Sequence, residues 1–309
     1  MQNITGLILI LIAGLLNPVQ TGVNSTLRNY LRTPILSSTV SFLVGLTSLI
    51  IMTLMTCSTL FPSGETVSGL PWWAWLGGLA GAIGLTGNIL LFPKLGGVLT
   101  ALMPMLGQIL MSMLIDTFGW FDTEPIPMAT GRIAGLSLVI GGLIMYMSGK
   151  KSTDTNSRNK SIILWSLAGI ASGLTFAIQP VMNGRLAMAL GSSIHSAFIS
   201  FSISTIILIM LLLSTPEERR NIPRVFTAKR PWWTWTGGLL GAYYVSVFAL
   251  VTNWVGVGLA TLTSILGMII FSTVIDRKGF FGRTPQKIRP IQYAGLLLLF
   301  LGVVCIKVL

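Results

Sequence analysis

The sequence predicts an all-α integral membrane protein with ten transmembrane helices, arranged as two inverted five-helix repeats. Three observations lead to this fold class: a composition suited to lipid, apolar segments of membrane-spanning length along the whole chain, and a sequence block that occurs twice. Of the 309 residues, 52% are hydrophobic and only 9% are charged, and the mean hydropathy is +0.81. Soluble globular domains carry about 25% charged residues, so this composition excludes them.

The apolar segments set the expected number of membrane crossings. A helix needs about 20 apolar residues to cross the hydrocarbon core of a bilayer. Segments of that length fall at 4–23, 35–57, 72–92, 95–115, 131–148, 161–180, 194–213, 232–252, 256–275 and 291–309. Because the segments are continuous rather than alternating, helices are favoured over a membrane barrel.

The positions of the basic residues predict the orientation in the membrane. With ten helices, the loops on one side hold 17 of the 20 Lys and Arg residues, and the other side has only Arg132, Arg185 and Lys307. The positive-inside rule then places the basic loops in the cytoplasm and both termini outside the inner membrane. The net charge of +12 lies in these loops, which favours contact with lipid headgroups and gives no reason to expect a nucleic-acid partner.

An internal repeat divides the chain near its middle. The block PWWAWLGGLAGA at 71–82 returns as PWWTWTGGLLGA at 231–242. Earlier in each half the same register continues with a slightly smaller offset, so that Gln20 corresponds to Gln179 and Asn24 to Asn183. We therefore expect a first repeat at 1–149, a cytoplasmic linker at 150–160 and a second repeat at 161–309. An odd number of helices in each repeat forces the second repeat to enter the membrane from the opposite side.

Inverted repeats are typical of secondary transporters, in which the two halves exchange conformations to open the protein first to one side and then to the other. The sequence therefore predicts gradient-driven or facilitative transport of a small metabolite by alternating access. We expect a monomer with an internal pseudo-dimer, with a homodimer as the alternative. A flippase for a lipid or lipid-linked molecule and a multidrug or cation exporter remain open as other functions.

The repeated PWW-x-W-x-GG-x-x-GA block and the L-x-D-x-x-G-x-F-like segments at 114–121 and 274–281 resemble the YdcZ-type branch of the drug/metabolite transporter superfamily, in a fused double-length form. The resemblance covers nearly the whole chain and implies transport of small metabolites, amino acids, nucleotide sugars or cationic drugs. Small multidrug relatives carry a glutamate in the middle of their first helix. The first helix here has no acid, which disfavours a proton-coupled cation exporter of that design.

Polar residues inside apolar segments are the candidate substrate-binding or gating residues, because polar groups in lipid are costly unless they face an interior or a cavity. They are Asn17, Gln20, Asn24, Asn88, Gln108, Gln179, Asn183 and Asn253. Gln179 and Asn183 repeat Gln20 and Asn24, so these four form a symmetric set. The same amides could instead hold helices together through hydrogen bonds of about 0.6 kcal/mol each.

Two acids, Asp116 and Asp276, recur between the halves at the ends of apolar segments. Either they anchor interfacial turns or they couple transport to protons. The tryptophans of the two PWW blocks are expected to lie at the membrane interface, with a position facing a cavity as the alternative for Trp75 and Trp235. The glycines that follow them are expected to allow close helix packing.

Other functions have little support in the sequence. The chain contains no Walker loop, GxGxxG or HExxH motif, so we expect no cofactor, no metal site and no ATP-driven step. His195 lies beside Ser192 and Ser193 but has no acid in the apolar segments to orient it, and we expect no enzyme activity.

Overall fold

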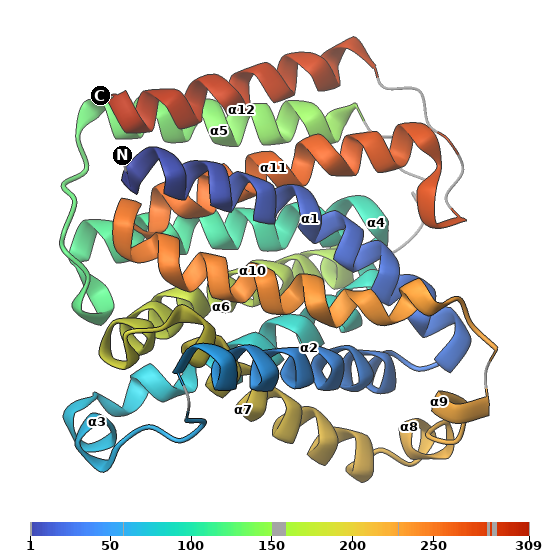
Figure 1. The fold of residues 1–309 in the computed structure, drawn as a ribbon. Helices are drawn as coiled ribbons and strands as arrows, with labels where there is room; N and C mark the ends of the chain where they lie inside the picture. The colour runs from blue at the N-terminus through green and yellow to red at the C-terminus, as the bar shows by residue number, and fades with distance from the viewer. Residues whose placement is uncertain are drawn as a thin grey trace.

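The computed structural model describes residues 2–57, 59–149, 159–227, 229–282, 285 and 289–308, and all regular elements in these ranges are helices. The long helices are α1 (Gln2–Leu31), α2 (Pro34–Cys57), α4 (Gly77–Phe118), α5 (Thr130–Ser148), α6 (Asn159–Leu190), α7 (Ser193–Ser214), α10 (Thr236–Val255), α11 (Val257–Lys278) and α12 (Pro290–Val308). Short helices α3 (Gly64–Gly69), α8 (Pro216–Arg220) and α9 (Arg224–Thr227) connect them, as Figure 1 shows.

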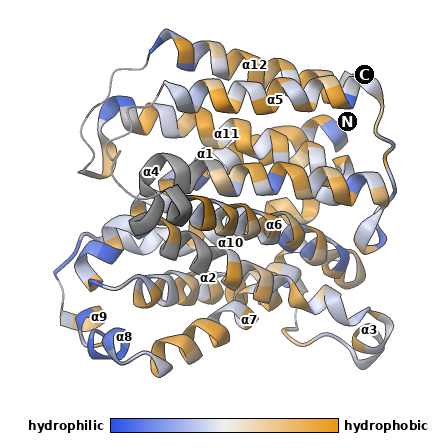
Figure 2. Cartoon of the chain, turned by 180° about the vertical axis from the view of Figure 1, so that it is seen from behind, coloured by the Kyte–Doolittle hydropathy of each residue, from blue (hydrophilic) through white to orange (hydrophobic). Residues whose placement is uncertain are grey.

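Six helices in the described part of the chain are long and apolar enough to cross a membrane, and three shorter apolar helical segments accompany them. Hydrophobic residues run along the helices on the outside of the bundle (Figure 2). Large apolar side chains such as Ile4, Met55 and Leu164 are exposed there, as expected for surfaces that contact lipid. The predicted class of all-α membrane protein is confirmed.

Helices α1 and α6 extend further than the sequence indicated. The expected ends lay at residues 23 and 180, whereas α1 ends at Leu31 and α6 at Leu190. The apolar stretch of each helix ends where the helix is expected to leave the lipid. The backbone stays helical beyond this point, because α1 meets Pro34 and α6 meets the helix-ending Gly191 only several residues later. These extensions carry much of the site described below.

Helix α4 is a single helix of 42 residues that covers the predicted segment 95–115 and residues 77–92 of the predicted segment 72–92. Residues 72–76 form the preceding short helix η1 (Trp72–Leu76). The two ends of α4 nevertheless lie beside the same part of α6: Gly77 contacts Asn183, and Ile115 packs with Val181. A straight helix of this length would span about 63 Å. The chain direction therefore reverses between the arms 77–91 and 103–118, and the equivalent point in the second half is the break between α10 and α11 at Gly256, where φ is 83°.

Contacts recur in matched pairs between the two halves. Asn24 of α1 lies against Gly237 of α10, and Asn183 of α6 lies against Gly77 of α4. Helices α5 and α12 are antiparallel neighbours that meet at glycine pairs, Gly135 with Gly302 and Gly142 with Gly295. Phe42 of α2 and its equivalent Phe201 of α7 contact each other directly, with ring centroids 4.7 Å apart. Small residues at these crossings allow the backbones to approach closely.

The bundle has two distinct ends, which we name from Figure 1. The terminal end holds both chain termini and the segment 119–129, and the α8 end holds α8 and α9. A buried apolar core built from α4, α5, α11 and α12 lies between them, and it includes Ile109, Leu143, Leu262 and Leu299.

Candidate functional site

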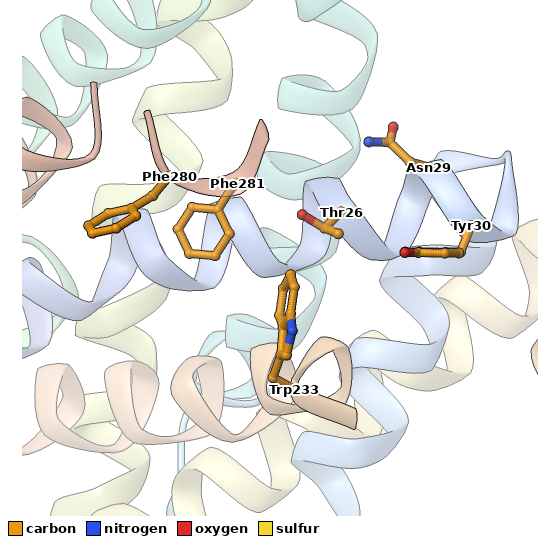
Figure 3. A pocket seen from close by; sticks show the side chains of 6 residues that line it. All are labelled: Thr26, Asn29, Tyr30, Trp233, Phe280 and Phe281. Carbon is orange, nitrogen blue, oxygen red and sulfur yellow. The ribbon is translucent and has the colours of Figure 1, made fainter. Parts of the chain in front are cut away.

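A pocket of about 500 Å³ lies at the α8 end of the bundle. Helix α1 forms one wall, and the short helices η3 (Trp232–Trp235) and η4 (Phe280–Gly282) form the others. The lining residues are Thr26, Asn29, Tyr30, Trp233, Phe280 and Phe281 (Figure 3). Pockets of this volume are large enough for a metabolite-sized ligand.

Local sequence explains how these side chains reach the pocket. Asn29 and Tyr30 lie three and four residues after Thr26, so both are neighbours of Thr26 on the surface of the α1 extension. After α11, Gly279 and Phe281 both adopt positive φ, of 70° and 59°, and this turn brings the Phe281 ring against Gly22 of α1. The ring then meets Trp233 edge to face, with centroids 6.0 Å apart.

The equivalent positions at the terminal end are occupied differently. Trp73 and Phe121 make the same edge-to-face contact, with centroids 5.3 Å apart. Val181 stands where the α8 end has Gly22, and it is buried in a cluster with Ile115 against which Phe121 packs. Arg185, the equivalent of Thr26, places its Nε 3.5 Å from Asp122 Oδ2. At this end an ion pair thus joins the residues that correspond to Thr26 and Gly282.

The four symmetric amides predicted from the sequence lie against glycines of the opposite half. Gln20 contacts Gly241, and Gln179 contacts Gly81, one turn along from the two asparagine contacts. Asn183 donates from Nδ2 to Ser200 Oγ at 3.2 Å. The Oδ1 atoms of Asn24 and Asn183 are buried without a hydrogen-bond partner. These amides sit where the two halves touch, away from the pocket lining.

The other predicted amides are dispersed. Asn253 donates from Nδ2 to the Gly184 carbonyl at 2.9 Å, linking α10 to α6. Asn17 and Gln108 are half-buried on α1 and α4. The side chains of Asn88 and Asp276 lie outside the described residues. A role in substrate binding or gating stays a prediction for these amides, as does turn anchoring or proton coupling for Asp276. The described side chains of this set do not line the pocket.

Asp116 is the centre of a buried polar cluster at the terminal end. Its side chain is 2% exposed. The carboxylate accepts hydrogen bonds from the backbone N–H groups of Val257 at 2.9 Å and Gly258 at 2.8 Å, and from Arg132 Nη2 at 3.0 Å. It thereby caps the N-terminus of α11, where the helix dipole favours a negative charge. Arg132 also donates to the Ile126 carbonyl at 2.7 Å.

Sequence reasoning missed two residues with a similar role. From the sequence, Arg132 was counted only as a charge outside the basic loops. Two features could have pointed to its role: it follows Asp116 across one short loop, and its equivalent in the second half is the uncharged Gln292. Glu218 was also missed: its carboxylate accepts from the backbone N–H groups of Ile35 at 3.2 Å and Leu36 at 2.9 Å, which caps α2. An acid within a basic loop gave no clear signal.

The pocket can bind an organic molecule through ring stacking and hydrogen bonding. Its described lining residues supply four aromatic rings, one hydroxyl from Thr26, one from Tyr30 and the Asn29 amide, and none of these residues is ionised. In the parts of the chain that the structure describes, no three His, Cys, Asp or Glu residues lie close enough to hold a metal ion.

Long apolar helices, matched halves and an end-facing pocket define a multi-pass membrane protein of the transporter class. A family model described as "Putative inner membrane exporter, YdcZ" matches residues 5–145 and, a second time, residues 164–305. The chain therefore belongs to the YdcZ family, as a double-length member. The starts and the ends of the two matches are offset from each other in the same way as the two copies of the internal repeat.

A solved structure described only as "Crystal structure of protein" has the same fold. Its TM-score is 0.64 at 13% sequence identity, over 98% of this chain and 95% of the other. At this identity the likeness concerns the fold alone. Among curated proteins, none matches this chain.

Proposed function

We propose that this protein is a secondary transporter that exports a small organic molecule across the inner membrane by alternating access between two inverted five-helix repeats. The observation that carries the proposal is the difference between the two ends. Matched elements leave a pocket at the α8 end, whereas an ion pair and a packed aromatic cluster occupy the same place at the terminal end.

Ten spans in two repeats account for the helix arrangement. Because the chain reverses within α4, this helix supplies two crossings. The second arm of α4 contains the apolar segment Met103–Phe118. Counting the two arms separately gives five long helical segments before the linker and five after it. The repeats are then residues 1–149 and 161–309, and five crossings in each make their orientations opposite.

The charge distribution supports an orientation with the α8 end in the cytoplasm. Basic residues at this end include Arg28, Arg32, Arg219, Arg220, Arg224, Arg230, Arg277 and Lys278. Under the positive-inside rule this end faces the cytoplasm and both termini face outward. The pocket would then be open to cytoplasmic solutes, which suits uptake of a compound for export.

The amide–glycine contacts suit a movement of one half against the other. Asn24 and Gln20 meet glycines of α10, and Asn183 and Gln179 meet glycines of α4. A glycine offers no side chain that must repack when a helix shifts, and Cα–H···O contacts to the buried amide oxygens are weak. We assign these four residues to the contact surfaces about which the gates move.

For Asp116 we favour the anchoring role over proton coupling. Its carboxylate accepts three hydrogen bonds, one of them from a guanidinium. Charge-assisted bonds of this kind favour the ionised form and fix its position. A group that must take up and release a proton in each cycle would lose this network every time.

Reconstitution into liposomes tests the proposal. Metabolites, amino acids and cationic drugs would be screened for movement under imposed proton or sodium gradients, with a fluorescent lipid assayed in parallel. We expect a soluble compound to move, and its flux to stop when Asp122→Cys and Arg185→Cys are joined by oxidation. Movement of the lipid alone would replace the metabolite transporter with a flippase.

A further inference from the structure

The polar residues of the pocket are specific to the α8 end. Thr26, Asn29 and Tyr30 have Arg185, Met188 and Ala189 as their equivalents in the other half. The aromatic walls, in contrast, are repeated, since Trp233 and Phe281 correspond to Trp73 and Phe121. The aromatic residues occur in both halves and therefore belong to the repeated architecture. The polar residues occur at one end only, which is expected of a ligand site and not of a structural feature that both halves share.

The geometry of the walls suits a flat ring. Figure 3 shows Thr26, Asn29 and Tyr30 along α1, with the rings of Trp233 and Phe281 converging beside Thr26. Aromatic rings gain about 0.5–1.5 kcal/mol beyond area burial from stacked or edge-to-face contacts. The Thr26 hydroxyl donates to the Gly22 carbonyl at 2.9 Å, so its oxygen is left to accept a hydrogen bond from a ligand N–H or O–H group.

The charges around the pocket disfavour an ionised ligand. Arg277 and Lys278 lie three and two residues before Phe280 on the chain, and Arg28 and Arg32 lie beside the lining residues of α1 in the sequence, so a cation would meet a positive surface. None of the described residues that line the pocket carries a guanidinium or ammonium group, so an anion would lose water without gaining an ion pair to any of them. Arg283 and Lys287 lie outside the described residues, which makes an anionic probe a necessary part of the test. Asp276 lies one turn before Phe280 with its side chain outside the described residues, which makes a cationic probe a necessary part of the test.

We propose that the pocket at the α8 end binds an uncharged planar aromatic compound, stacked against Trp233 and Phe281 and hydrogen-bonded by Thr26 and Asn29. This inference rests on the proposed function in taking the pocket as the cytoplasmic site of a transported solute. Binding at the pocket can be measured without any transport, so the two proposals can fail separately.

Three probes that share one ring and differ in charge test the inference: radiolabelled indole, indole-3-acetate and tryptamine. Equilibrium binding to the purified full-length protein should be saturable for indole and at least about tenfold weaker for both charged probes. Trp233→Ala should weaken indole binding about tenfold, the loss expected for one stacked ring. Trp73→Ala, the matched change at the terminal end, should alter it by less than about twofold.

Two further variants separate loss of the site from misfolding. Trp233→Phe keeps an aromatic wall and should restore most of the indole affinity, whereas Thr26→Arg introduces the residue of the other half and should abolish binding. Each variant would first be compared with the unmodified protein by thermal unfolding. Tighter binding of tryptamine than of indole, equal losses in Trp233→Ala and Trp73→Ala, or the absence of saturable indole binding would each overturn the assignment. Indole binding without any solute flux in liposomes would instead contradict the transport function alone.

Discussion

The two ends of the bundle are built from equivalent elements and yet differ in what they hold. At the α8 end, the Phe281 ring lies against Gly22, and Thr26 lines the pocket. At the terminal end, Val181 and Arg185 stand at the equivalent positions; Val181 packs in a cluster with Phe121, and Arg185 pairs with Asp122. The two ends therefore differ by a few substitutions at matched positions.

The size of this difference suits a switch. The Arg185–Asp122 pair is 34% and 62% exposed, so solvent screening limits it to about 0–1 kcal/mol. The Trp73–Phe121 contact has its equivalent in Trp233–Phe281 at the α8 end, so it does not add to the difference. A bias of at most about 1 kcal/mol is one that a bound ligand or a gradient could reverse.

The largest effect on stability should come from the Asp116 cluster, because it holds the buried charges of the terminal end. Asp116→Ala leaves the Arg132 guanidinium buried without its partner and uncaps α11, and we expect a loss of about 3–5 kcal/mol in the free energy of unfolding. Thermal or denaturant unfolding in detergent measures it. The double variant Asp116→Asn/Arg132→Gln has no buried charge at this place and has a glutamine where the second half has Gln292. It should therefore recover much of the lost stability. If Asp116→Ala unfolds like the unmodified protein, the cluster does not anchor α11.

Gly22→Val should close the α8 end by giving it the residue of the terminal end. A Cβ at Gly22 would collide with the Phe281 ring, so this ring must move into the pocket. We expect solute flux to fall at least about tenfold, the factor given by a change of about 1.4 kcal/mol, and the matched Val181→Gly to loosen the terminal end. Flux assays in liposomes compare the two, and unchanged flux in Gly22→Val would remove the pocket from the transport path.

Glu218→Ala should have a moderate effect, because it removes the cap of α2 and leaves two backbone N–H groups unpaired. Loss of a helix cap costs about 0.5–2 kcal/mol, and we expect a destabilisation in that range. The control is Glu217→Ala, at the adjacent and exposed position. Hydrogen exchange at Ile35 and Leu36 gives a local reading: equal exchange in both variants would show that the carboxylate does not hold α2.

The smallest change in stability should follow Arg185→Thr, which gives the terminal end the residue of the α8 end. The exposed ion pair contributes at most about 1 kcal/mol, so unfolding should hardly change while the terminal end opens more often. Labelling of Trp120→Cys, which leaves both members of the ion pair in place, by a membrane-impermeant maleimide, with and without Arg185→Thr, measures this opening. Faster labelling with Arg185→Thr is expected, and the difference should shrink in high salt.

The fold could be predicted because apolar segment length and an internal repeat are both visible in a sequence. Apolar segments that cross the lipid alternate along the chain with polar loops, as 4–23 and 35–57 do with the residues between them. The helix ends were less accessible, because α1 continues past its apolar part to Leu31. That extension carries Thr26, Asn29 and Tyr30, so a site built on it could not be located from the apolar segments.

The polar residues within the apolar segments also did not indicate where the candidate site lies. Amides within apolar segments were expected to face a cavity, but Asn183 found partners in Ser200 and a glycine surface instead. The pocket is lined by aromatic residues such as Trp233, which the sequence alone assigned to the membrane interface. Which tryptophan of a PWW block turns inward depends on the short η3 helix that follows the proline, and its geometry is set by tertiary contacts.

The central claim is that the two ends open alternately, and reciprocal accessibility tests it most directly. In a protein lacking Cys57 and Cys305, Asp122→Cys and Arg185→Cys would be cross-linked to close the terminal end, and maleimide labelling of Phe280→Cys would be timed at the α8 end. The matched protein would carry a Thr26→Cys/Gly282→Cys cross-link and be labelled at Trp120→Cys, the equivalent of Phe280. We predict that closing either end speeds labelling at the other. Equal labelling rates with and without the cross-link at the opposite end would contradict alternating access between the repeats.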